Sequence, residues 1–405
     1  MKSRVSILFL IVIFTFLGFN AGYLFGQSPI APIQFFNLAG ISDTGEATSP
    51  IMETWQLVHA RYYEQPVDDD ALVQGAIDGM LASLGDQHTR YLSPEAEEAA
   101  RLNMQGEFQG IGAEVEAIDG NITVVSPIDG SPAEAAGLLP GDILRQADGV
   151  DLTGMDVSEA AGLVRGPAGT AVSLLIERDG ETFTVEITRD TVELPSVRGE
   201  MLDDGIAYAR LSQFGDRSPE ELQALLEELL AQDPVGLILD LRRNPGGALT
   251  SAIDIADIFL PEGTILTERF GNGRSDSFKA TDEGIAQDIP LVVLVDEGSA
   301  SASEVLAGAI RDHERGILVG QTTFGKGTVQ TWQELSNGGG VRITIARWLT
   351  PDETWVHETG LEPDYVVVQP ELADGEEWVD VQLQTAVDYL LGRPITSAPT
   401  EQNDG

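Results

Sequence analysis

The chain of 405 residues contains no cysteine. This absence excludes a cysteine nucleophile, a thiolate zinc site and a disulfide framework. Basic residues are also scarce, because 23 Lys and Arg stand against 66 Asp and Glu and give a formal charge of −43. Such a strong negative charge argues against a nucleic-acid partner and against electrostatic docking on anionic lipid. The simplest interpretation is a well-solvated acidic surface.

Histidine is rare as well, with only four residues in the chain. The sequence contains no His-Glu-x-x-His segment and no Asp-x-Asp-x-Asp-Gly loop. It therefore lacks both the zinc-hydrolase motif and the calcium loop that these patterns define. We expect no metal and no cofactor.

One long apolar run is present, and it lies at the N-terminus. Lys2 and Arg4 precede a run from Val5 to Phe25 that is almost uniformly apolar. Its length is about that of a membrane span, roughly 20 residues, and no Ala-x-Ala cleavage site follows it. We predict that residues 1–26 form a single-pass signal anchor. Because a positive flank stays in the cytoplasm, the rest should lie in the periplasm or outside the cell. A cleaved signal peptide is the close alternative.

The remaining chain divides into segments of different composition, consistent with two or three domains. Pro, Ser, Gly and Thr suggest a stalk, helical spacing of apolar residues follows, and short strands then form a small β-rich module. Next, strands and helices alternate, which favours an α/β core, and a polar, disordered tail ends the chain. The predicted boundaries are 27–49 for the stalk, 50–104 for the helical segment, 105–191 for the β-rich module, 192–393 for the α/β core and 394–405 for the tail.

The β-rich module carries a recognisable pattern. The stretch SPIDGSPAEAAGLLPGDIL, residues 126–144, closely resembles the PDZ family, as does the loop Phe108-Gln-Gly-Ile-Gly112. In a PDZ domain such a loop exposes backbone N–H groups that capture the terminal carboxylate of a peptide, which adds as a strand. The resemblance assigns this role to Phe108, Gly110, Ile111 and Gly112, beside a strand over 113–117. The simpler alternative is that the glycines only make a tight turn.

A cluster of serines follows an apolar run that is typical of a buried strand. The segment Asp296-Glu-Gly-Ser-Ala-Ser-Ala-Ser-Glu304 lies where this strand gives way to a predicted helix. A nucleophile there gains the positive end of the helix dipole, and the N–H of Ala302 can point at a developing oxyanion. Serine is also a good helix cap, and spacing alone does not choose among Ser299, Ser301 and Ser303; Ser336 competes as well.

A single lysine lies in a glycine-flanked segment further along. Lys326 stands between Gly325 and Gly327. To act as a base its pKa must fall from about 10.4 to about 7–8, which burial beside apolar groups can supply. The alternative is an exposed lysine in a surface hairpin, because most lysines in proteins are exposed.

A third segment, Arg242-Arg-Asn-Pro-Gly-Gly247, follows another predicted buried strand. Its glycines let the backbone approach a substrate closely, and the N–H groups of Gly246 and Gly247 could complete an oxyanion hole. Asn-Pro-Gly-Gly is equally suited to a plain β-turn. Together the three segments suggest a hydrolase.

In this order, and behind a PDZ module, the segments resemble the carboxy-terminal processing proteases. These are serine peptidases of the S41 type with a Ser-Lys dyad, and the resemblance covers about residues 50 to 370. It implies a multi-domain α/β protein whose crotonase-like β-α core carries an inserted PDZ domain and an N-terminal helical segment. It also implies an endopeptidase that recognises substrate C-termini, preferably apolar ones, and cleaves through an acyl-enzyme; members are often homo-oligomers.

The resemblance assigns roles residue by residue. The nucleophile is Ser301, the general base is Lys326 and the residue that orients the lysine is Gln330; the oxyanion hole is Gly246, Gly247 and Ala302, with Asp312 in support. Arg165 lies where a gate between the PDZ domain and the core could act. The chain departs from the family after Leu349-Thr-Pro351, where residues 352–358 replace a glycine-bearing turn.

Two rival interpretations remain. A Ser-His-Asp triad would need one of His59, His88, His313 or His357. His313 follows Asp312 on a predicted helix, but adjacent helical residues do not face one another, and His88 is interpreted as structural. The non-enzymatic rival is a membrane-anchored PDZ scaffold that only binds protein C-termini.

Overall fold

A computed structural model describes residues 44–128, 130–370 and 378–395 of the chain. The predicted signal anchor, residues 1–26, lies outside this part, as does the predicted tail from residue 396 onward. Among the described residues, no helix combines the length and the apolar character that a membrane crossing requires.

The chain forms two compact units, one ending at Leu72 and the other starting at Val73. The first unit contains α2 (Thr44–Arg61). Residues 44–49, predicted as the end of a stalk, are therefore helical. In the last turn of α2, the His59 ring shares a 2.6 Å hydrogen bond with the Asp69 carboxylate. A hydrogen bond to the backbone of Trp55 and this carboxylate together raise the pKa of His59.

Helices α3 (Asp69–Ala82) and α4 (Pro94–Met104) complete the helical segment predicted over 50–104. The start of α4 follows directly from its sequence. Ser93 accepts a hydrogen bond from the backbone N–H of Ala96, and Pro94 occupies the first turn, where its missing N–H costs nothing. Between the two helices, β1 (Arg90–Leu92) leaves the helical segment and joins a sheet of the core.

The β-rich module is a six-stranded antiparallel sheet with two short helices, α5 (Pro132–Ala135) and α6 (Val157–Val164). Alternate residues of its strands, such as Val172, Leu174 and Ile176, are fully buried against a separate apolar core. The strands are β3 (Ala113–Ile118), β4 (Asn121–Pro127), β5 (Ile143–Ala147), β6 (Val150–Asp151), β7 (Ala171–Arg178) and β8 (Glu181–Thr188). The short strands predicted for this module are confirmed.

The predicted loop Phe108–Gly112 is only partly a loop. Residues Glu107–Gly110 form strand β2, which pairs antiparallel with β9 (Asp190–Glu193). The two strands are the entry to and exit from the module, so the ladder closes its base. The loop proper is reduced to Ile111 and Gly112.

The α/β core is built on a second six-stranded sheet, in which all neighbours are parallel except the first pair. Its order is β10 (Val197–Met201), β11 (Ala207–Leu211), β12 (Leu237–Asp240), β15 (Leu291–Val295), β16 (Ile317–Gly320) and β19 (Tyr365–Val366). The apolar runs predicted as strands buried on both faces are the central strands β12 and β15, as expected for a parallel sheet covered by helices.

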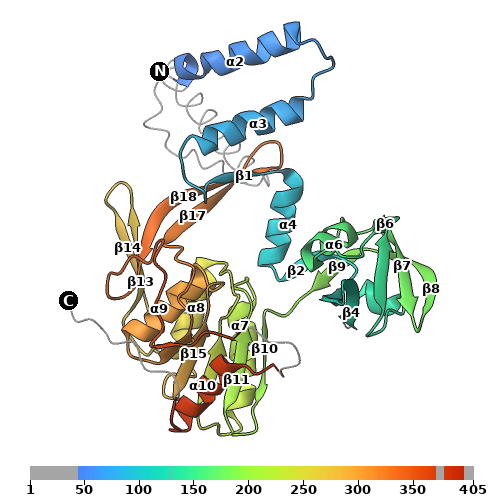
Figure 1. Cartoon of the computed structure of the whole chain (residues 1–405). Coiled ribbons are helices and arrows are strands. Elements are labelled where there is room, and N and C mark those ends of the chain that lie inside the picture. Colours follow the sequence, from blue (N-terminus) through green and yellow to red (C-terminus); the bar gives the residue numbers. More distant parts are fainter. Residues whose placement is uncertain (1–43, 129, 371–377, 396–405) are drawn as a thin grey trace, which may run out of the picture. The chain divides into compact units, whose positions relative to one another are not determined.

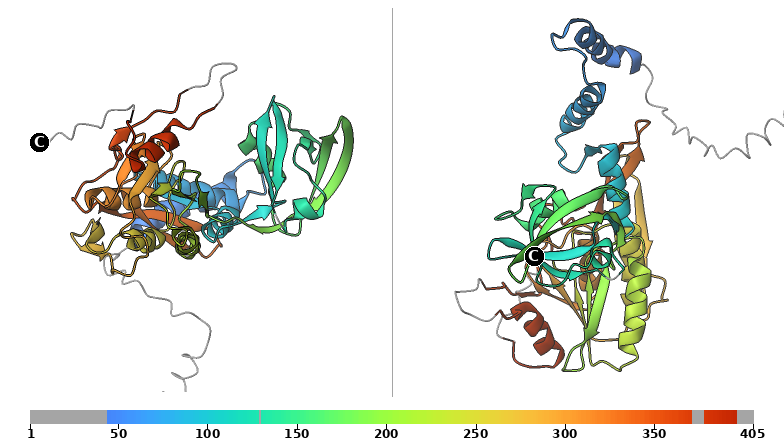
Figure 2. Two further views of the ribbon diagram at one scale, coloured as in Figure 1. Left: turned by 90° about the horizontal axis from the view of Figure 1, so that it is seen from below. Right: turned by 90° about the vertical axis from the view of Figure 1, so that its right-hand side faces the viewer.

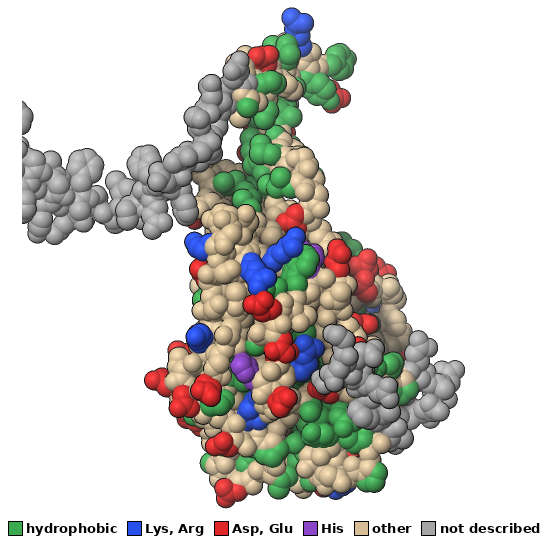
Figure 3. Space-filling model, turned by 90° about the vertical axis from the view of Figure 1, so that its left-hand side faces the viewer, with side chains coloured by type: hydrophobic (Ala, Val, Ile, Leu, Met, Phe, Trp, Pro, Cys, Tyr) green, Lys and Arg blue, Asp and Glu red, His purple; other side chains and the backbone are tan. Residues whose placement is uncertain are grey.

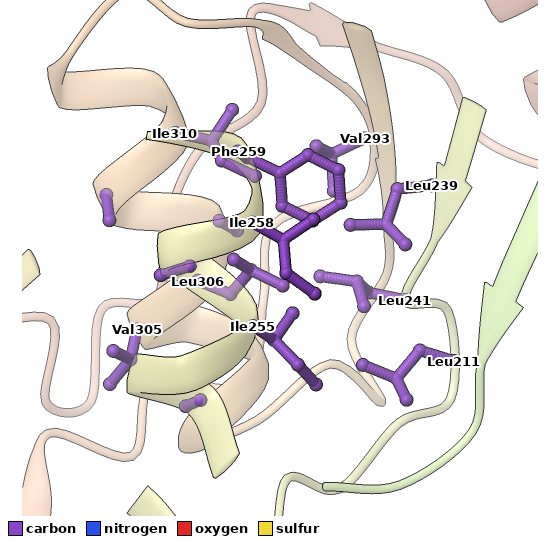
Figure 4. Packing of buried hydrophobic residues seen from close by; sticks show 14 of the residues in the cluster. Leu211, Leu239, Leu241, Ile255, Ile258, Phe259, Val293, Val305, Leu306 and Ile310 are labelled. Atoms are coloured by element: carbon purple, nitrogen blue, oxygen red, sulfur yellow. The ribbon is translucent and has the colours of Figure 1, made fainter. Parts of the chain in front are cut away.

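The side chains of these strands alternate between two apolar clusters. Leu237 and Leu239 of β12 face α7 (Ser218–Leu230), α8 (Leu249–Phe259) and α9 (Ala302–Asp312), whereas Ile238 faces α10 (Val381–Leu390). Figure 4 shows Phe259 and Leu306 meeting strand residues in the first cluster. In the right-hand view of Figure 2, α7 and α10 lie on opposite sides of the strands. The core is therefore a three-layer α/β structure, and the predicted multi-domain α/β fold class is confirmed.

A third sheet carries the segment after Lys326. It contains β1, β13 (Thr264–Phe270), β14 (Ser275–Lys279), β17 (Thr328–Glu334) and β18 (Gly340–Leu349), with β18 between β1 and β13 and also paired with β17. Strands β17 and β18 form the long hairpin of Figure 1. Strand β17 begins two residues after Lys326.

The acidic composition appears on the surface. Red carboxylate side chains are spread over the visible face of the molecule in Figure 3, and blue basic side chains are sparse there. One carboxylate that is buried in the core is paired. Asp240 is fully buried at the end of β12 and accepts hydrogen bonds from Arg242 and from the Tyr208 hydroxyl. Arg242, the first residue of the glycine-rich turn, thus anchors that turn to the sheet.

Candidate active site

The backbone at Ser301 adopts a conformation that is costly for a residue with a side chain. Ser301 has φ 56° and ψ −111°, and it lies between the end of β15 and the start of α9. A non-glycine residue in such a conformation costs roughly 1–3 kcal/mol, and such residues gather at functional sites. The surrounding turn holds it in place.

The turn is fastened by the two serines that compete with Ser301. Ser299 Oγ donates to the carbonyl of Leu241, and Ser303 Oγ donates to the carbonyl of Asn244. Both serines are fully buried, while Ser301 is half-buried. Ser336 is exposed in the turn between β17 and β18. Of the four candidates, Ser301 combines access to solvent with the strained backbone.

A buried glutamate joins Ser301 to the lysine segment. Glu304, on the first turn of α9, is fully buried. Its Oε2 accepts the backbone N–H of Ser301 at 2.7 Å and that of Lys326 at 2.8 Å. Its Oε1 accepts the Thr323 hydroxyl and the N–H of Gly325. One carboxylate oxygen thus holds the backbones of the predicted nucleophile and the predicted base side by side.

The environment of Lys326 weakens its charged form. Its side chain is half-buried, and burial, followed by the positive charges of Arg342 and Arg90, lowers its pKa to about 8; Glu304 opposes the shift. Among the described residues, Lys326 forms neither an ion pair nor a hydrogen bond to Ser301. An amine with this pKa is uncharged in part of the molecules near neutral pH, and no carboxylate pairs with it among the described residues.

Gln330 lies on β17, four residues beyond the lysine. Its side-chain amide donates to Thr328 Oγ1 at 2.8 Å and to Thr344 Oγ1 at 3.3 Å. In this structure the amide is thus engaged with neighbouring threonines, and the sequence-predicted contact with Lys326 is not made.

The glycine turn lies directly against the nucleophile. A Cβ atom on Gly246 would come within 3.0 Å of Ser301 Cβ and 2.9 Å of the Ala302 nitrogen, so only glycine fits. The N–H of Gly246 donates to Asn244 Oδ1 at 2.9 Å. The N–H groups of Gly247 and Ala302 have no hydrogen-bond partner within the part of the chain that the structure describes. These two donors are available for an oxyanion beside Ser301.

Asp312 and His313 lie at the other end of α9 from Ser301. Asp312 accepts hydrogen bonds from the Arg311 guanidinium and from the backbone N–H of Asp352. His313 Nε2 is 2.8 Å from the carbonyl of Thr264. Both residues therefore fasten neighbouring loops and do not contact the serine, which leaves Asp312 in a supporting position.

The segment that departs from the family packs against the lysine loop. Trp355 Nε1 donates to the carbonyl of Gly327, and the N–H of Glu358 donates to the carbonyl of Gly325. Trp348, at the end of β18, donates to the carbonyl of Lys326 itself. Residues 355–360 thus cover the backbone on either side of the lysine.

Two histidines lie in the same region, although no sequence pattern indicates that they meet. His88 and His357 are in edge-to-face contact with ring centroids 6.1 Å apart, and His357 stacks on Trp355. Burial, followed by the charge of Lys326, lowers the pKa of His88. The charge of Lys326 acts on His88, so His88 is the histidine to control for in any test of the base.

The PDZ module presents an open backbone loop beside an apolar groove. The N–H groups of Ile111 and Gly112 have no partner among the described residues, and Gly112 has φ 75° with no room for a Cβ beside Ser131. Ile111, Val157 and Val164 line the groove. Phe108 lies on β2 with the Arg165 guanidinium 5.5 Å from its ring centre. Two free backbone N–H groups beside an apolar groove can donate hydrogen bonds to the terminal carboxylate of a peptide.

Comparisons with family models define the class. The chain matches the model of peptidase family S41 over residues 205–367 and that of the PDZ domain over 123–178. Residues 38–96 match the activating protease CtpB N-terminal domain. A serine peptidase with a PDZ domain is therefore the class that fold and sequence share.

Individual relatives agree. The chain is 41% identical over 350 residues to a carboxyl-terminal-processing protease of Synechocystis sp., covering 84% of this chain and 82% of the relative. It is 39% identical over 335 residues to the carboxy-terminal processing protease CtpA of Bacillus subtilis, covering 82% and 72%. The solved photosystem II D1 C-terminal processing protease is 32% identical, with a TM-score of 0.50 over 78% of this chain and 88% of that one. The chain belongs to the carboxy-terminal processing proteases of peptidase family S41.

Proposed function

We propose that this serine peptidase binds the C-terminus of a protein substrate in its PDZ domain and cleaves the substrate through Ser301, with Lys326 as the general base. The observation that carries the proposal is the single Glu304 oxygen to which the N–H groups of both residues donate. This shared oxygen makes the two residues neighbours, although Ser301 follows a strand of one sheet and Lys326 precedes a strand of another. The seryl hydroxyl needs a base, and a half-buried lysine with a pKa of about 8 is uncharged in a useful fraction of molecules near neutral pH.

The chemistry follows from these positions. The uncharged Lys326 amine takes the proton of Ser301 as Oγ attacks the carbonyl carbon of the scissile peptide bond. The oxyanion that forms accepts hydrogen bonds from Ala302 and from the glycine turn, where Gly247 has the free N–H. The resulting ammonium protonates the leaving amine, so the C–N bond breaks and an ester to Ser301 remains.

Hydrolysis reverses the roles. The amine, again uncharged, takes a proton from water as the water attacks the ester, and the ammonium returns that proton to Ser301 as the acid leaves. We assign to Gln330 the orientation of the Lys326 amine. For this role its side chain must give up one of its hydrogen bonds to a threonine and form one to Lys326 instead. Asp312 supports the site indirectly, by holding the loop at Asp352.

The test of the mechanism is covalent trapping. A fluorophosphonate, which esterifies activated serines, is expected to add one equivalent to the full chain at Ser301, as read by mass spectrometry of the digested protein. Ser301→Ala should remain unlabelled and should not cleave an unfolded protein substrate, while Ser303→Ala retains Ser301 and serves as the matched comparison. Labelling of a different serine, or cleavage by Ser301→Ala, would refute the assignment. Peptide binding without cleavage by the parent would favour the PDZ scaffold.

We also propose that the PDZ groove selects the substrate. A free carboxylate would accept the N–H groups of Ile111 and Gly112, and an apolar last side chain would enter the groove beside Val157 and Val164. Phe108 and Gly110, on β2, would lie beside the bound peptide. Arg165, whose guanidinium lies over the Phe108 ring, would change its contacts with the core when the groove is occupied.

Substitution in the carboxylate loop tests this selection. Gly112→Val places a branched side chain where φ is positive and where Ser131 leaves no space. We expect the affinity for a peptide with a free apolar C-terminus to fall at least tenfold, measured by fluorescence anisotropy. The same peptide with an amidated C-terminus should bind weakly to the parent and no more weakly to the variant. Equal binding of both peptides to the parent would exclude carboxylate capture.

The localisation is part of the proposal. Residues 1–26 would anchor the chain in the cell membrane with the peptidase outside the cytoplasm, in the periplasm or at the cell exterior, where protein C-termini are its substrates. The strong negative charge argues against nucleic acid as a partner. Helices within 51–101 are the candidate contact for a homo-oligomer.

A further inference from the structure

Two arginines lie side by side on adjacent strands of the sheet that follows the lysine loop. Arg90 of β1 and Arg342 of β18 are directly opposite partners in an antiparallel ladder. Directly opposite residues point to the same face of a sheet, and like charges in such a pair are destabilising. Neither arginine forms an ion pair among the described residues, in a chain with 66 acidic residues that could supply one.

The face on which the arginines lie is the face of the candidate site. Thr344 follows Arg342 by two positions on β18, so both side chains leave the strand on the same side. Gln330 is the ladder partner of Thr344 and donates to its hydroxyl. The two cations therefore share a surface with Gln330, and β17, which bears Gln330, begins directly after the lysine loop.

Arg342 is also partly removed from water. Its guanidinium lies 5.6 Å from the ring centre of Trp332, and burial, followed by the charge of Arg90, lowers its pKa. The charges of Arg342 and Arg90 likewise act on Lys326, second only to burial. Partial burial strengthens such effects because less water screens them.

We propose that Arg90 and Arg342 are positioning residues whose unpaired positive charges keep the Lys326 amine uncharged and ready to accept the Ser301 proton. The inference rests on the proposed role of Lys326 as base. A nearby cation disfavours a second cation, so the arginine pair offsets the carboxylate of Glu304, which favours the ammonium form. This accounts for a like-charge pair that would otherwise only weaken the sheet. The other titratable groups that face this region are Glu304 on α9, Asp86 and His88 before β1, and His357 in the loop before β19.

The composition of the chain allows a direct test. Its only lysines are Lys2, Lys279 and Lys326. Full-length protein labelled with ¹³C at the lysine ε-carbon should therefore give three NMR signals in detergent solution. The signal that is lost in Lys326→Arg is the signal of Lys326. Titration of this signal reads the protonation of Lys326 without any turnover.

We expect the parent signal to titrate near pH 8 and to shift to higher pH in Arg342→Gln and in Arg90→Gln. The acid limb of the kcat/KM profile should move by the same amount. At pH 7 kcat/KM should fall about three- to tenfold, with little loss at pH 10. Arg342→Lys, which keeps the charge, should restore the parent titration. Arg274→Gln, in the same sheet but at the β13–β14 turn, is the matched control and should leave both readouts unchanged.

Unchanged titration of Lys326 in both arginine variants would overturn the proposal. A loss of activity that is equal at all pH values, or one confined to KM, would also overturn it, because it would indicate a structural or substrate-binding role. Thermal melting of each variant verifies folding, and Arg90→Gln, on the three-residue strand β1, provides the result if Arg342→Gln does not fold. If the parent cleaves no substrate but Lys326 still titrates as expected, the proposed function fails and the charge effect stands.

Discussion

Replacement of Lys326 by methionine is expected to lower kcat/KM by about 10³-fold or more, because the variant has no group to take the proton of Ser301. Methionine keeps the length and the apolar contacts of the lysine stem, so the half-buried site should stay packed. The measurement is the cleavage of an unfolded protein or a peptide with an apolar C-terminus, under conditions where the parent is active.

The pH dependence of the activity tests the same role of Lys326. The base must be uncharged, and burial lowers its pKa to about 8. Activity of the parent should therefore rise with pH through about 8 and level off above it, since the ammonium loses its proton there. The residual activity of Lys326→Met should lack this limb.

Lys279→Met is the matched control, because Lys279 is exposed on β14 and is the one other described lysine. Its activity should equal that of the parent. Substantial activity in Lys326→Met would contradict the dyad. If that activity then disappeared in the double variant with His88→Phe, the base would be the histidine that lies in the same electrostatic environment.

Replacement of Glu304 by glutamine should be almost as damaging, although Glu304 takes no part in proton transfer. Each carboxylate oxygen accepts two hydrogen bonds. An amide must turn its NH₂ group toward two of these donors, which leaves buried groups unpaired at a cost of about 3–5 kcal/mol. We expect a lower melting temperature and a loss of kcat of at least about 100-fold, since in either orientation of the amide the backbone at Gly325 or Lys326 loses its acceptor.

The two effects of this change can be separated. Loss of the Glu304 charge alone would lower the pKa of Lys326 further, because that carboxylate opposes its depression. A variant that only changed charge would thus gain activity on the acid side. Glu297→Gln, the same substitution at an exposed position of the same turn, should melt and cleave like the parent. Parent-like activity in Glu304→Gln would show that the shared oxygen is dispensable.

The sequence indicated the segments of the candidate site but not the contacts between them. Small residues between a buried strand and a helix indicated a nucleophile in the 299–303 cluster, but they could not distinguish Ser301. The distinction depends on hydrogen bonds from Ser299 and Ser303 to residues about 60 positions earlier, which no local pattern reveals. Glu304 was within reach of prediction, because a serine and a glutamate three residues apart have the spacing of a capping box.

The sheet that carries the lysine was largely missed, and the reason is its exposure. Strands β12 and β15 are buried on both faces and give continuous apolar runs. Strand β17 has exposed polar residues through most of its length, so its pattern resembles a loop. The proposed mechanism requires a depressed pKa for Lys326, but the local sequence does not explain it. The depression comes first from burial in the fold and then from the charges of Arg342 and Arg90, which lie on other strands.

The proposed nucleophile follows β15 of one sheet, whereas the proposed base precedes β17 of another. The Glu304 side chain and one backbone hydrogen bond, from Phe324 to Ser299, tie the two segments together. Sliding of one layer past its neighbour would therefore pull the reacting atoms apart while each layer kept its own ladder intact. Proteolysis in such a molecule can cease through a small local loosening, long before the polypeptide as a whole melts.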